Sequence, residues 1–446
     1  ERRLAEKRLA YLARFDTLTG LPNRNAFMER LADVIAAAAR QDSWAVLYFD
    51  LDRFKTVNDT FGHGVGDLLL HAVARRGLET VQLPHVLARF GGDEFAVIWT
   101  EPLDAEQIGK IADRLIASLS EPYEISGHRL AVGVSIGIAA GGDGHQDLAT
   151  IMKNADTALY RAKRDGGGCH RFFEPSMDAA LQARQKLEVD LRDAFARREF
   201  EVFYQPQFDL VDRRLTGVEA LLRWRHAERG FVSPAEFVPV AEEIGIMEAL
   251  GAWVLCQACT EVARWPRDIK VAVNVSPVQF MRGDIVAAVD DALARSGLPA
   301  RRLELEITES LFIQENGAIR ATMDEIGRRG IGFALDDFGT GYSSLSYLRK
   351  FPIGKIKIDR SFVTGIPHDE EAVAIVQAVI ALAGNLGIRT NAEGLETAEQ
   401  IELLHLLGCN EGQGYGLGKP QPAESIIALL SSGKGGAVAT PARRTG

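Results

Sequence analysis

Two stretches decide how this chain is organised: Arg89-Phe90-Gly91-Gly92-Asp93-Glu94-Phe95 and, further along, Glu219-Ala220-Leu221-Leu222-Arg223-Trp224. In the first, two glycines precede a pair of acidic residues and an apolar run from Phe95 to Trp99. Glycine adopts the positive φ of a tight turn, and its small size lets the backbone approach a bound group closely. The stretch therefore predicts a β-hairpin that presents the side chains of Asp93 and Glu94.

Length and composition limit the number of domains and the class of protein but do not identify the fold. The chain has 446 residues, of which 46% are hydrophobic and 25% are charged, and a globular chain of this length usually forms two or three domains. No apolar run reaches the ~20 residues of a membrane-spanning helix. The net charge of -10 argues against binding a nucleic-acid polymer, which needs clustered lysine and arginine. A small nucleotide held through metal ions is compatible with this charge.

The cysteines form no disulfide framework for a chain of this length, which indicates a reducing, cytoplasmic environment. They are Cys169, Cys256, Cys259 and Cys409. Cys256 and Cys259 make a CxxC pair, but the residues around them repeat with helical spacing, and no second CxxC or histidine pair lies nearby. Two thiols on one amphipathic helix are the favoured interpretation, and a zinc or redox site is the alternative.

The first part of the chain predicts a mixed α+β domain at residues 15–173, with a helix at about 25–40 and strands at 45–49, 95–99 and 132–138. Residues 1–14 predict a charged signalling helix or linker that looks cut from a longer protein. An upstream sensor domain is therefore expected, and a membrane anchor in the longer protein is compatible with this interpretation. Residues 174–181 are the predicted linker, and a charged helix extends over about 177–198.

Residues 182–430 predict an α/β barrel of the (β/α)8 type. Short strand-like runs recur with helical material between them, near Phe200, Val218, Val271, Leu303, Phe333, Lys355, Ile388 and Gln413. The last residues, 431–446, are too small and polar to pack against a core and predict a disordered tail.

Acidic and amide side chains stand at the carboxyl ends of these strands, where active sites form in this architecture. They comprise Gln205, Glu219, Asn274, Glu306, Glu309, Asp336, Asp337, Lys357, Glu393, Glu396 and Gln413. Carboxylates at short range raise one another's pKa values, so divalent cations are expected. Oxygen ligands without cysteine or histidine favour Mg²⁺ or Mn²⁺.

Two such ions, bridged by the adjacent Asp336 and Asp337, would favour in-line displacement at phosphorus and hence phosphodiester hydrolysis. Lys357 is then expected beside the attacking water, as a base or an orienting group. Arg223 supplies a planar fork for the phosphate.

This second domain resembles EAL domains, which hydrolyse cyclic di-GMP to linear pGpG. The resemblance rests on Tyr204-Gln205-Pro206, Glu219 to Arg223, Asn274 to Pro277, Glu306 to Glu309, Asp336 to Gly341, Lys357 to Asp359, Ala392 to Glu396 and Gln413 to Tyr415. It implies a site with two metal ions, in which Glu393 reaches a metal-bound water and the ligands are Glu219, Asn274, Glu306, Asp336 and Asp337. Substrate contacts are expected from Gln205, Arg223, Glu396 and Gln413.

The EAL resemblance also implies a homodimer. Glu309 would hold the loop from Asp337 to Gly341, which in the family couples metal binding to dimerisation. One stretch departs from the family: Gly416-Leu417-Gly418-Lys419 stands where an aromatic residue and a serine commonly precede Lys-Pro. This departure concerns a wall beside a guanine and therefore bears on affinity more than on catalysis.

Residues 15–173 resemble GGDEF domains, which make cyclic di-GMP from two GTP. Besides the glycine hairpin, the resemblance includes the stretches from Phe61 to Asp67 and from Asp156 to Lys163. It implies that Asp50 and Asp93 hold Mg²⁺ with GTP and that Glu94 lies near the reacting 3′-hydroxyl. Asn58 and Asp67 are expected to contact the guanine base. Contacts near the phosphates are expected from Phe54, Lys55, Gly91, Gly92 and Lys163.

One departure from the GGDEF pattern concerns the triphosphate. The family's arginine in Gly-Arg-Asn is replaced, because this chain has Gly166-Gly167-Gly168. Weak cyclase activity is therefore expected, with Arg164 or Arg171 as possible substitutes.

A second departure concerns feedback. The arginine and aspartate of the family's product-inhibition motif are replaced by Gln82 and His85, so inhibition by cyclic di-GMP is expected to be absent or weak. His85 and His63 are expected to be exposed loop histidines without a chemical role.

Two functions stay open. The favoured one is hydrolysis of cyclic di-GMP by the EAL domain, joined to a GGDEF domain that binds GTP and either makes cyclic di-GMP or regulates its hydrolysis. The alternative is a catalytically inactive receptor for these nucleotides that acts through protein partners. Such a receptor is expected to have lost metal ligands, and the predicted set is complete in this sequence.

Overall fold

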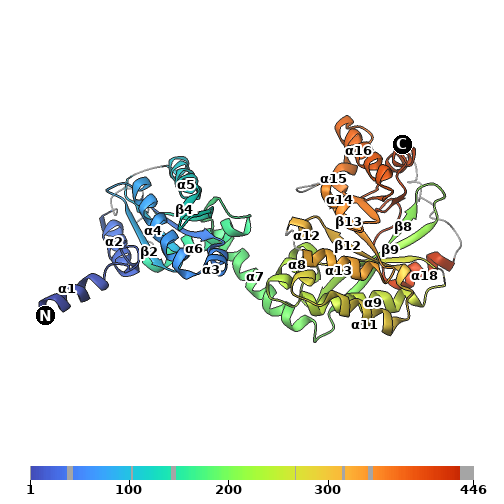
Figure 1. Ribbon diagram of the computed structural model, residues 1–446, viewed down its shortest axis with the longest axis horizontal. Helices are drawn as coiled ribbons and strands as arrows, with labels where there is room; N and C mark the ends of the chain where they lie inside the picture. The colour runs from blue at the N-terminus through green and yellow to red at the C-terminus, as the bar shows by residue number, and fades with distance from the viewer. Residues whose placement is uncertain are drawn as a thin grey trace. The chain divides into compact units, whose positions relative to one another are not determined.

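The computed structural model describes residues 2–37, 44–101, 104–141, 147–266, 268–313, 317–339 and 345–431 (Figure 1). Its internal contacts divide the chain into two compact units, one ending at Gln185 and the other beginning at Lys186. The tail predicted at 431–446 lies outside the described residues, except for Ser431 at the end of a helix.

A five-stranded sheet forms the centre of the first unit, in the order β2-β3-β1-β6-β7. The buried central strand, β1 (Trp44–Asp52), pairs antiparallel with β3 (Glu94–Trp99) and β6 (Gly133–Gly141). The edges are β2 (Val86–Gly91) and β7 (His170–Phe172). The three predicted strands are confirmed, and the two edge strands are additional to them.

Helices pack on both faces of this sheet, so β1 carries apolar side chains on each side. Leu47 and Phe49 lie in one core with α4 and α5, whereas Val46 and Tyr48 lie in another with α2 and α6. Because side chains alternate along a strand, Asp50 lies on the same face as Tyr48. The helices are α1 (Arg2–Leu12), α2 (Arg24–Ala37), α3 (Phe54–Phe61), α4 (His63–Thr80), α5 (Ala105–Ser120) and α6 (Leu148–Arg164), and a small hairpin is formed by β4 (Tyr123–Ile125) and β5 (His128–Leu130).

Eight strands close into a barrel within the described part of the second unit (Figure 1). Their order is β9-β11-β12-β13-β14-β15-β16-β8, and β8 pairs back with β9. They lie at the predicted positions: β8 (Phe200–Asp209), β9 (Leu215–His226), β11 (Lys270–Asn274), β12 (Leu303–Thr308), β13 (Gly332–Phe338), β14 (Lys355–Ile358), β15 (Arg389–Ala392) and β16 (Glu411–Gly412).

The first barrel strand runs in an unexpected direction. Neighbouring barrel strands from β9 through β11 to β16 are parallel, whereas β8 is antiparallel to both β9 and β16. The connection between β8 and β9, residues 210–214, is too short for the crossover that a parallel pair requires, so the two strands form a hairpin. Gln205 was expected at the carboxyl end of its strand; instead it lies within β8, opposite Glu219.

Helices surround the barrel. They include α8 (Pro234–Glu243), α9 (Met247–Ala263), α10 (Pro277–Met281), α11 (Ile285–Ser296), α12 (Ser310–Ile313), α13 (Gly317–Gly327), α14 (Leu345–Lys350), α15 (Arg360–Thr364), α16 (Glu370–Leu386), α17 (Ala398–Leu406) and α18 (Ala423–Ser431). Among the helices that the structure describes, none is both long and apolar enough to cross a membrane.

Helix α7 (Pro175–Ala194) runs without a break through the predicted linker at 174–181. Near its start, Asp178 accepts a hydrogen bond from Lys153 of α6 at 2.6 Å. Near its end, Leu191 is buried in an apolar cluster with Trp224 of β9. One helix therefore contributes contacts to each of the two units.

Charged side chains line the interior of the barrel in two layers. Glu304 and Glu306 are two residues apart on β12, as are Lys355 and Lys357 on β14, so both members of each pair point inward at different heights. In the lower layer, Lys355 Nζ lies 2.6 Å from Glu304 and 2.8 Å from Glu411. Two more cations contact these carboxylates, Lys270 at 3.8 Å and Arg389 at 3.1 Å. The lower layer is thus balanced by the protein's own cations.

We predict that Leu191→Ala lowers the free energy of unfolding of the second unit by about 2–5 kcal/mol, because truncating a fully buried leucine removes contacts and leaves a cavity. Val189→Ala is the matched control, since Val189 lies on the same helix and is 60% exposed; its effect should stay within about 0.5 kcal/mol. Urea titration followed by tryptophan fluorescence measures both. Equal effects would contradict the packing of α7 on the barrel.

Candidate functional site

Lys357 lies at the centre of the upper layer and is only 1% exposed. Its Nζ is 2.7 Å from Glu306, 2.7 Å from Glu393, 3.0 Å from Asp336 and 3.5 Å from Glu219. One ammonium group therefore faces four carboxylates that come from β9, β12, β13 and the residue after β15. The structure brings these five predicted residues together.

The charges of this cluster do not cancel. Burial alone would lower the pKa of Lys357, but the surrounding carboxylates raise it well above its usual value. Burial and then Glu219 raise the pKa of Glu306 well above the ordinary range. Burial also raises the pKa of Glu393 to about 8, against the effect of Lys357. Such a surplus of acidic groups in a buried place is typical of a site that takes further positive charge.

Amide side chains fix the orientation of Glu219. Asn274 Nδ2 donates to its Oε1 at 2.7 Å, and Gln413 Nε2 donates to its Oε2 at 2.6 Å. Burial alone would raise the pKa of Glu219, but Lys357 and these amides lower it overall. Gln207 in turn donates to Gln413 Oε1 at 2.9 Å. Sequence reasoning missed Gln207, although its position two residues after Gln205 places it on the same face of β8.

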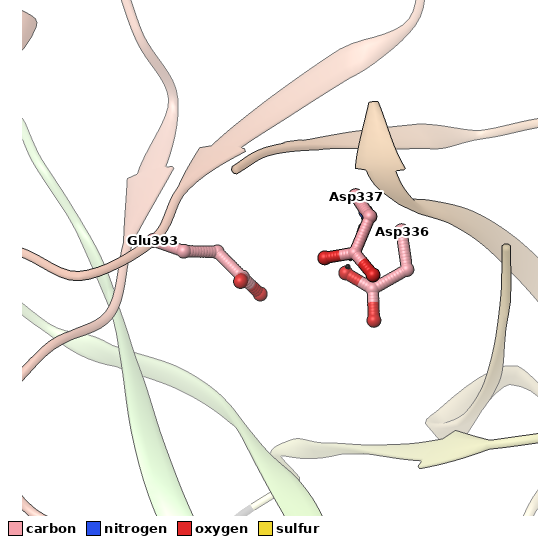
Figure 2. A group of neighbouring side chains, drawn as sticks. All are labelled: Asp336, Asp337 and Glu393. Carbon is pink, nitrogen blue, oxygen red and sulfur yellow. Dashed lines mark hydrogen bonds between the residues drawn. The ribbon is translucent and has the colours of Figure 1, made fainter. Parts of the chain in front are cut away.

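Asp336 and Asp337 are consecutive, yet both lie close to Glu393, as Figure 2 shows. Oxygen atoms of the three carboxylates lie within 4.8 Å of one another. Consecutive side chains of a regular strand point to opposite faces, but the register of β13 shifts between Leu335 and Phe338, and Asp337 has a φ of 52°. This irregularity redirects one side chain. The three acids consequently form a cluster that could hold a metal ion.

A pocket of about 500 Å³ opens beside Asn274. Its wall is largely apolar and includes Leu222, Val238 and Met247 from β9, α8 and α9. Arg223 also lines it; its Nη1 donates to the carbonyl oxygen of Leu222 at 2.9 Å, and burial lowers the pKa of its guanidinium. An apolar wall with one arginine, next to a carboxylate cluster, suits a flat ligand that carries phosphate.

Two predicted residues lie apart from the cluster. Glu309 Oε1 accepts a hydrogen bond from the backbone N of Gly339 at 2.9 Å, and the following residues, 340–344, lie outside the described part of the chain. Glu396 Oε1 accepts a hydrogen bond from Arg360 Nη2 at 2.9 Å. Glu396 is therefore engaged with α15.

The stretch from Gly416 to Lys419, which departs from the family pattern, is packed closely against neighbouring residues. A Cβ at Gly416 would lie 2.7 Å from the carbonyl oxygen of Glu396. Gln205 Nε2 donates to the carbonyl oxygen of Gly418 at 3.2 Å. These close approaches explain why glycine stands here. Exposed Tyr415, with Lys419 Nζ 5.3 Å from its ring centroid, is the aromatic side chain of this stretch.

In the first unit, Asp50 lies at the end of β1, opposite Glu94 of the hairpin. Lys163 Nζ on α6 is 2.6 Å from Asp50 Oδ2. Burial raises the pKa of Asp50 to about 6; Lys163 opposes this shift and Asp93 adds to it. The structure thus brings together two carboxylates that could hold a cation and the lysine predicted for phosphate.

Glu94 has neighbours that sequence reasoning missed. Tyr48 is hydrogen-bonded to it, and burial followed by this carboxylate raises the pKa of the tyrosine hydroxyl, which therefore donates. Asp156 on α6 faces the same group; burial and then Glu94 raise its pKa. Their spacing in the sequence indicated this position: Tyr48 stands two residues before Asp50 on a strand, and Asp156 stands two helical turns before Lys163, so each shares a face with a predicted residue.

Asn58 has a buried side-chain oxygen, Oδ1, without a hydrogen-bond donor among the described residues. A Cβ at Gly66 would lie 2.0 Å from this oxygen, so glycine is required there. The remaining predicted GTP contacts lie on the same unit: buried Phe54, exposed Lys55 and Asp67, and the hairpin residues Gly91 and Gly92 with φ of 140° and 53°.

The glycines from Gly166 to Gly168 form a turn after α6, and all three have positive φ. The backbone N of Gly168 donates to Asp52 Oδ2 at 2.9 Å, and a Cβ at Gly167 would lie 3.0 Å from the same oxygen. Arg171 pairs with Asp165 at 2.7 Å. This ion pair already occupies one of the two arginines named as substitutes for the missing cation, and Arg164 is exposed in the last turn of α6.

The expectation that His85 is an exposed loop residue was wrong. It is 8% exposed, its ring stacks on Trp99 with 3.4 Å between centroids, and its Nδ1 accepts a hydrogen bond from the backbone N of Thr100 at 3.3 Å. Burial lowers its pKa. The stacking partner comes from β3, which sequence spacing around His85 does not reveal. His63 is exposed, as expected, but it is the first residue of α4.

The CxxC pair lies on α9, as the sequence predicts. Both thiols are free, and Cys259 is buried. Burial raises the pKa of Cys259 to about 12, so this thiol is a poor nucleophile and metal ligand at neutral pH.

Two family models match the chain: "Diguanylate cyclase, GGDEF domain" over residues 13–169 and "EAL domain" over residues 188–420. The chain belongs to the tandem GGDEF–EAL family. MucR of Pseudomonas aeruginosa, a bifunctional diguanylate cyclase/cyclic di-GMP phosphodiesterase, is 43% identical over 96% of this chain and 63% of its own length. Protein y4lL of Sinorhizobium fredii is 46% identical over 97% of this chain and 52% of its own length. This GGDEF–EAL chain thus spans about half to two-thirds of these relatives.

Solved structures support the same assignment. The PaMucR phosphodiesterase in complex with c-di-GMP is 42% identical to this GGDEF–EAL chain, covers 54% of it and 99% of its own chain, and has a TM-score of 0.52. The cAMP-bound EAL enzyme Bd1971 is 27% identical, covers 78% of this chain and 92% of its own, and has a TM-score of 0.54. The chain is therefore a member of a cyclic di-GMP signalling family.

We predict that Gly167→Ala destabilises the first unit by about 1–2 kcal/mol, because a side chain at positive φ is strained and its Cβ would press on Asp52. Gly127→Ala is the matched control: Gly127 has a φ of +81°, but a Cβ there meets nothing within 4 Å. Scanning calorimetry of the full chain measures both. The close contact with Asp52 would be refuted by a loss at Gly167 no larger than at Gly127.

Proposed function

We propose that the EAL domain hydrolyses cyclic di-GMP to pGpG with the help of two divalent cations, Mg²⁺ or Mn²⁺. The observation that carries this proposal is the upper layer of the barrel, where one lysine faces four carboxylates. Cyclic di-GMP carries two phosphates and two flat bases, which match the carboxylate cluster, the arginine and the apolar pocket beside it. Membership of the GGDEF–EAL family supports the same substrate.

The residues present fit two hard cations. The carboxylates of the upper layer exceed the charge of Lys357, and Glu306 Oε1 is buried without a hydrogen-bond donor among the described residues. Oxygen donors of this kind suit Mg²⁺ and Mn²⁺. When bound, such ions lower the pKa of water and neutralise charge that develops on phosphate oxygens. The residues that would hold them are Glu219, Asn274, Glu306, Asp336 and Asp337, with Glu393 beside a bound water.

The chain's own groups position the substrate and the water. An ammonium group has only hydrogen-bond donors, so Lys357 orients the attacking water and keeps the carboxylates in place. Arg223 pairs with a phosphate through the two parallel N–H groups of its planar guanidinium. Leu222 and Met247 contact a base. Gln413 maintains the orientation of Glu219.

We predict Mg²⁺- or Mn²⁺-dependent conversion of cyclic di-GMP to pGpG, and a loss of about 100-fold or more in kcat for Glu219→Gln, because a carboxylate ligand is removed while its shape is kept. Chelation should abolish turnover, and Ca²⁺ should inhibit it because its coordination is larger and looser. Chromatographic separation of the nucleotides measures the products.

Glu411→Gln is the matched control for Glu219→Gln. Glu411 is also a buried barrel glutamate paired with a lysine, but it lies in the lower layer. Its substitution should lower stability and leave hydrolysis per folded molecule unchanged. Turnover that survives both chelation and Glu219→Gln would refute the metal mechanism.

The GGDEF domain is proposed to bind GTP with Mg²⁺ and to make cyclic di-GMP. Asp50 and Asp93 would hold the ion. The hydrogen bond from Tyr48 keeps Glu94 in place beside the reacting 3′-hydroxyl. Asn58 would donate to a ring acceptor of guanine, and the carboxylate of Asp67 would accept from the guanine N–H groups.

Replacing Asp93 and Glu94 with Ala should abolish the synthesis of cyclic di-GMP from GTP. Hydrolysis measured without GTP should stay within about twofold, because the two sites lie in separate units. Wild-type synthesis should be weak, because Gly167 supplies no cation, and insensitive to added cyclic di-GMP, because Gln82 and His85 lack the charges of the inhibitory motif. Assays of both reactions, with product added in excess, decide these points. Strong inhibition of synthesis by cyclic di-GMP bound at the first domain would refute the predicted insensitivity to product.

Coupling between the two reactions is proposed to pass through a homodimer and helix α7. A GGDEF site holds one GTP, so a cyclic dimer requires two such domains. The start of α7 is bound to α6, which carries Lys163, and its end packs beside Trp224, the neighbour of Arg223 in the chain. A ligand that binds two arrangements of this helix unequally would shift their populations.

We therefore predict that GTP changes the apparent affinity for cyclic di-GMP by about fivefold or more. The measurement is the hydrolysis rate at subsaturating substrate, with and without GTP. A variant with Asn58→Ala and Asp67→Ala is the control, and its rates should not respond to GTP. Wild-type rates that are identical with and without GTP would show that α7 is a passive tether.

A further inference from the structure

The first domain contains a second pocket, of about 510 Å³, that the assignments above do not use. It lies between α3, the segment from Arg129 to Gly133, and the turn of Gly166 to Gly168. No residue predicted above to contact guanine, metal or phosphate lines it. Two arginines do, Arg53 and Arg129, together with the hydroxyl-bearing residues Thr56 and Thr60.

The two arginines of this pocket outnumber its acid, Asp52, and pair with no carboxylate among the described residues. Asp52 is the acid among the lining residues, and both of its oxygens are occupied. Its Oδ1 accepts a hydrogen bond from Ser135 Oγ at 2.8 Å, and its Oδ2 accepts one from the backbone N of Gly168 at 2.9 Å. Within the described parts of the chain, neither Arg53 nor Arg129 forms an ion pair. Two unpaired guanidinium groups at one pocket, in a chain of net charge -10, favour an anionic ligand.

The backbone at Arg53 gives an independent indication. Arg53 precedes α3 with φ 62° and ψ 23°, in the left-handed region. Residues other than glycine take this conformation at a cost in free energy, and such positions cluster at ligand sites. The conformation joins β1 directly to α3, whose first N–H groups have no partner within the helix. Positive partial charge at this helix end adds to that of the arginine.

We propose that this pocket binds a phosphate group through Arg53 and Arg129. The group is either the terminal phosphate of GTP bound in the GGDEF site, in which case the inference rests on the GTP binding proposed above, or a separate phosphate-bearing anion. Both sources share the same chemistry: a compact, highly charged oxyanion that accepts paired hydrogen bonds from guanidinium groups.

The glycine turn is the reason why these two arginines are needed. Gly167 stands at the position of the family's triphosphate arginine, and its close approach to Asp52 leaves little room for a side chain. The turn shapes one wall of the pocket instead of supplying a cation. Charge for a phosphate then comes from other elements, α3 through Arg53 and β5 through Arg129.

Isothermal titration of the full chain in Mg²⁺ tests this proposal with three ligands. These are 3′-deoxy-GTP, which binds without cyclising, 3′-deoxy-GDP, and inorganic pyrophosphate. The variants are Arg53→Asn, because asparagine tolerates the left-handed region, and Arg129→Gln. Arg75→Gln on α4 is the matched control, an exposed arginine outside the pocket.

If the ligand is the terminal phosphate of GTP, each variant should weaken 3′-deoxy-GTP binding about tenfold or more and change 3′-deoxy-GDP binding less than about twofold. If it is a separate anion, pyrophosphate should bind wild type even with the GTP analogue at saturation. Each pocket variant should then weaken pyrophosphate binding about tenfold and leave the GTP analogue unaffected. Arg75→Gln should match wild type in every titration.

Variants that bind all three ligands as wild type does would overturn the proposal. A wild-type chain that binds pyrophosphate through these arginines, but no guanine nucleotide, would refute the proposed GTP binding and leave the phosphate site standing. If wild type binds none of the three ligands, both the phosphate site and the proposed GTP binding are overturned.

Discussion

The second domain depends on the interaction of the Lys357 ammonium group with the carboxylates around it. Four carboxylates converge on it inside a barrel, where ionised groups are costly to bury without partners. The lysine reduces this cost but does not remove it, because it brings a single positive charge. The domain thus folds around a site that is electrostatically incomplete. Its remaining demand for positive charge is the physical basis for the affinity for divalent cations proposed above.

The alternation of side chains along the strands lets this polar interior coexist with a stable fold. On β12, Glu304 and Glu306 point inward, while Leu303 and Leu305 join the apolar core outside the barrel. The same strand therefore serves both purposes on opposite faces. The balanced lower layer around Lys355 contributes to the packing of the barrel, whereas the upper layer is left with uncompensated charge.

The sequence predicted the positions of the barrel strands and most members of the upper layer, because strand periodicity and the residues at strand ends are local properties. It did not predict the direction of β8, which follows from the length of its connection to β9. Nor did it reveal that His85 stacks on Trp99, since that contact joins residues whose spacing carries no pattern. Gln207 and Tyr48 were missed for a different reason. Each stands two positions from a predicted residue on its own strand but is hydrogen-bonded to a residue of another segment, Gln207 to Gln413 and Tyr48 to Glu94, and only the fold shows these contacts.

The irregularity in β13 has a consequence for how such domains diverge. Asp336 and Asp337 reach one place only because the strand holds a residue more than regular alternation allows. Loss of the codon for either aspartate would restore the alternation and remove one of the two carboxylates from the site. The apolar pocket and Arg223 would be untouched by this deletion. A nucleotide receptor without hydrolytic chemistry is thus one short genetic step from an enzyme built on this barrel.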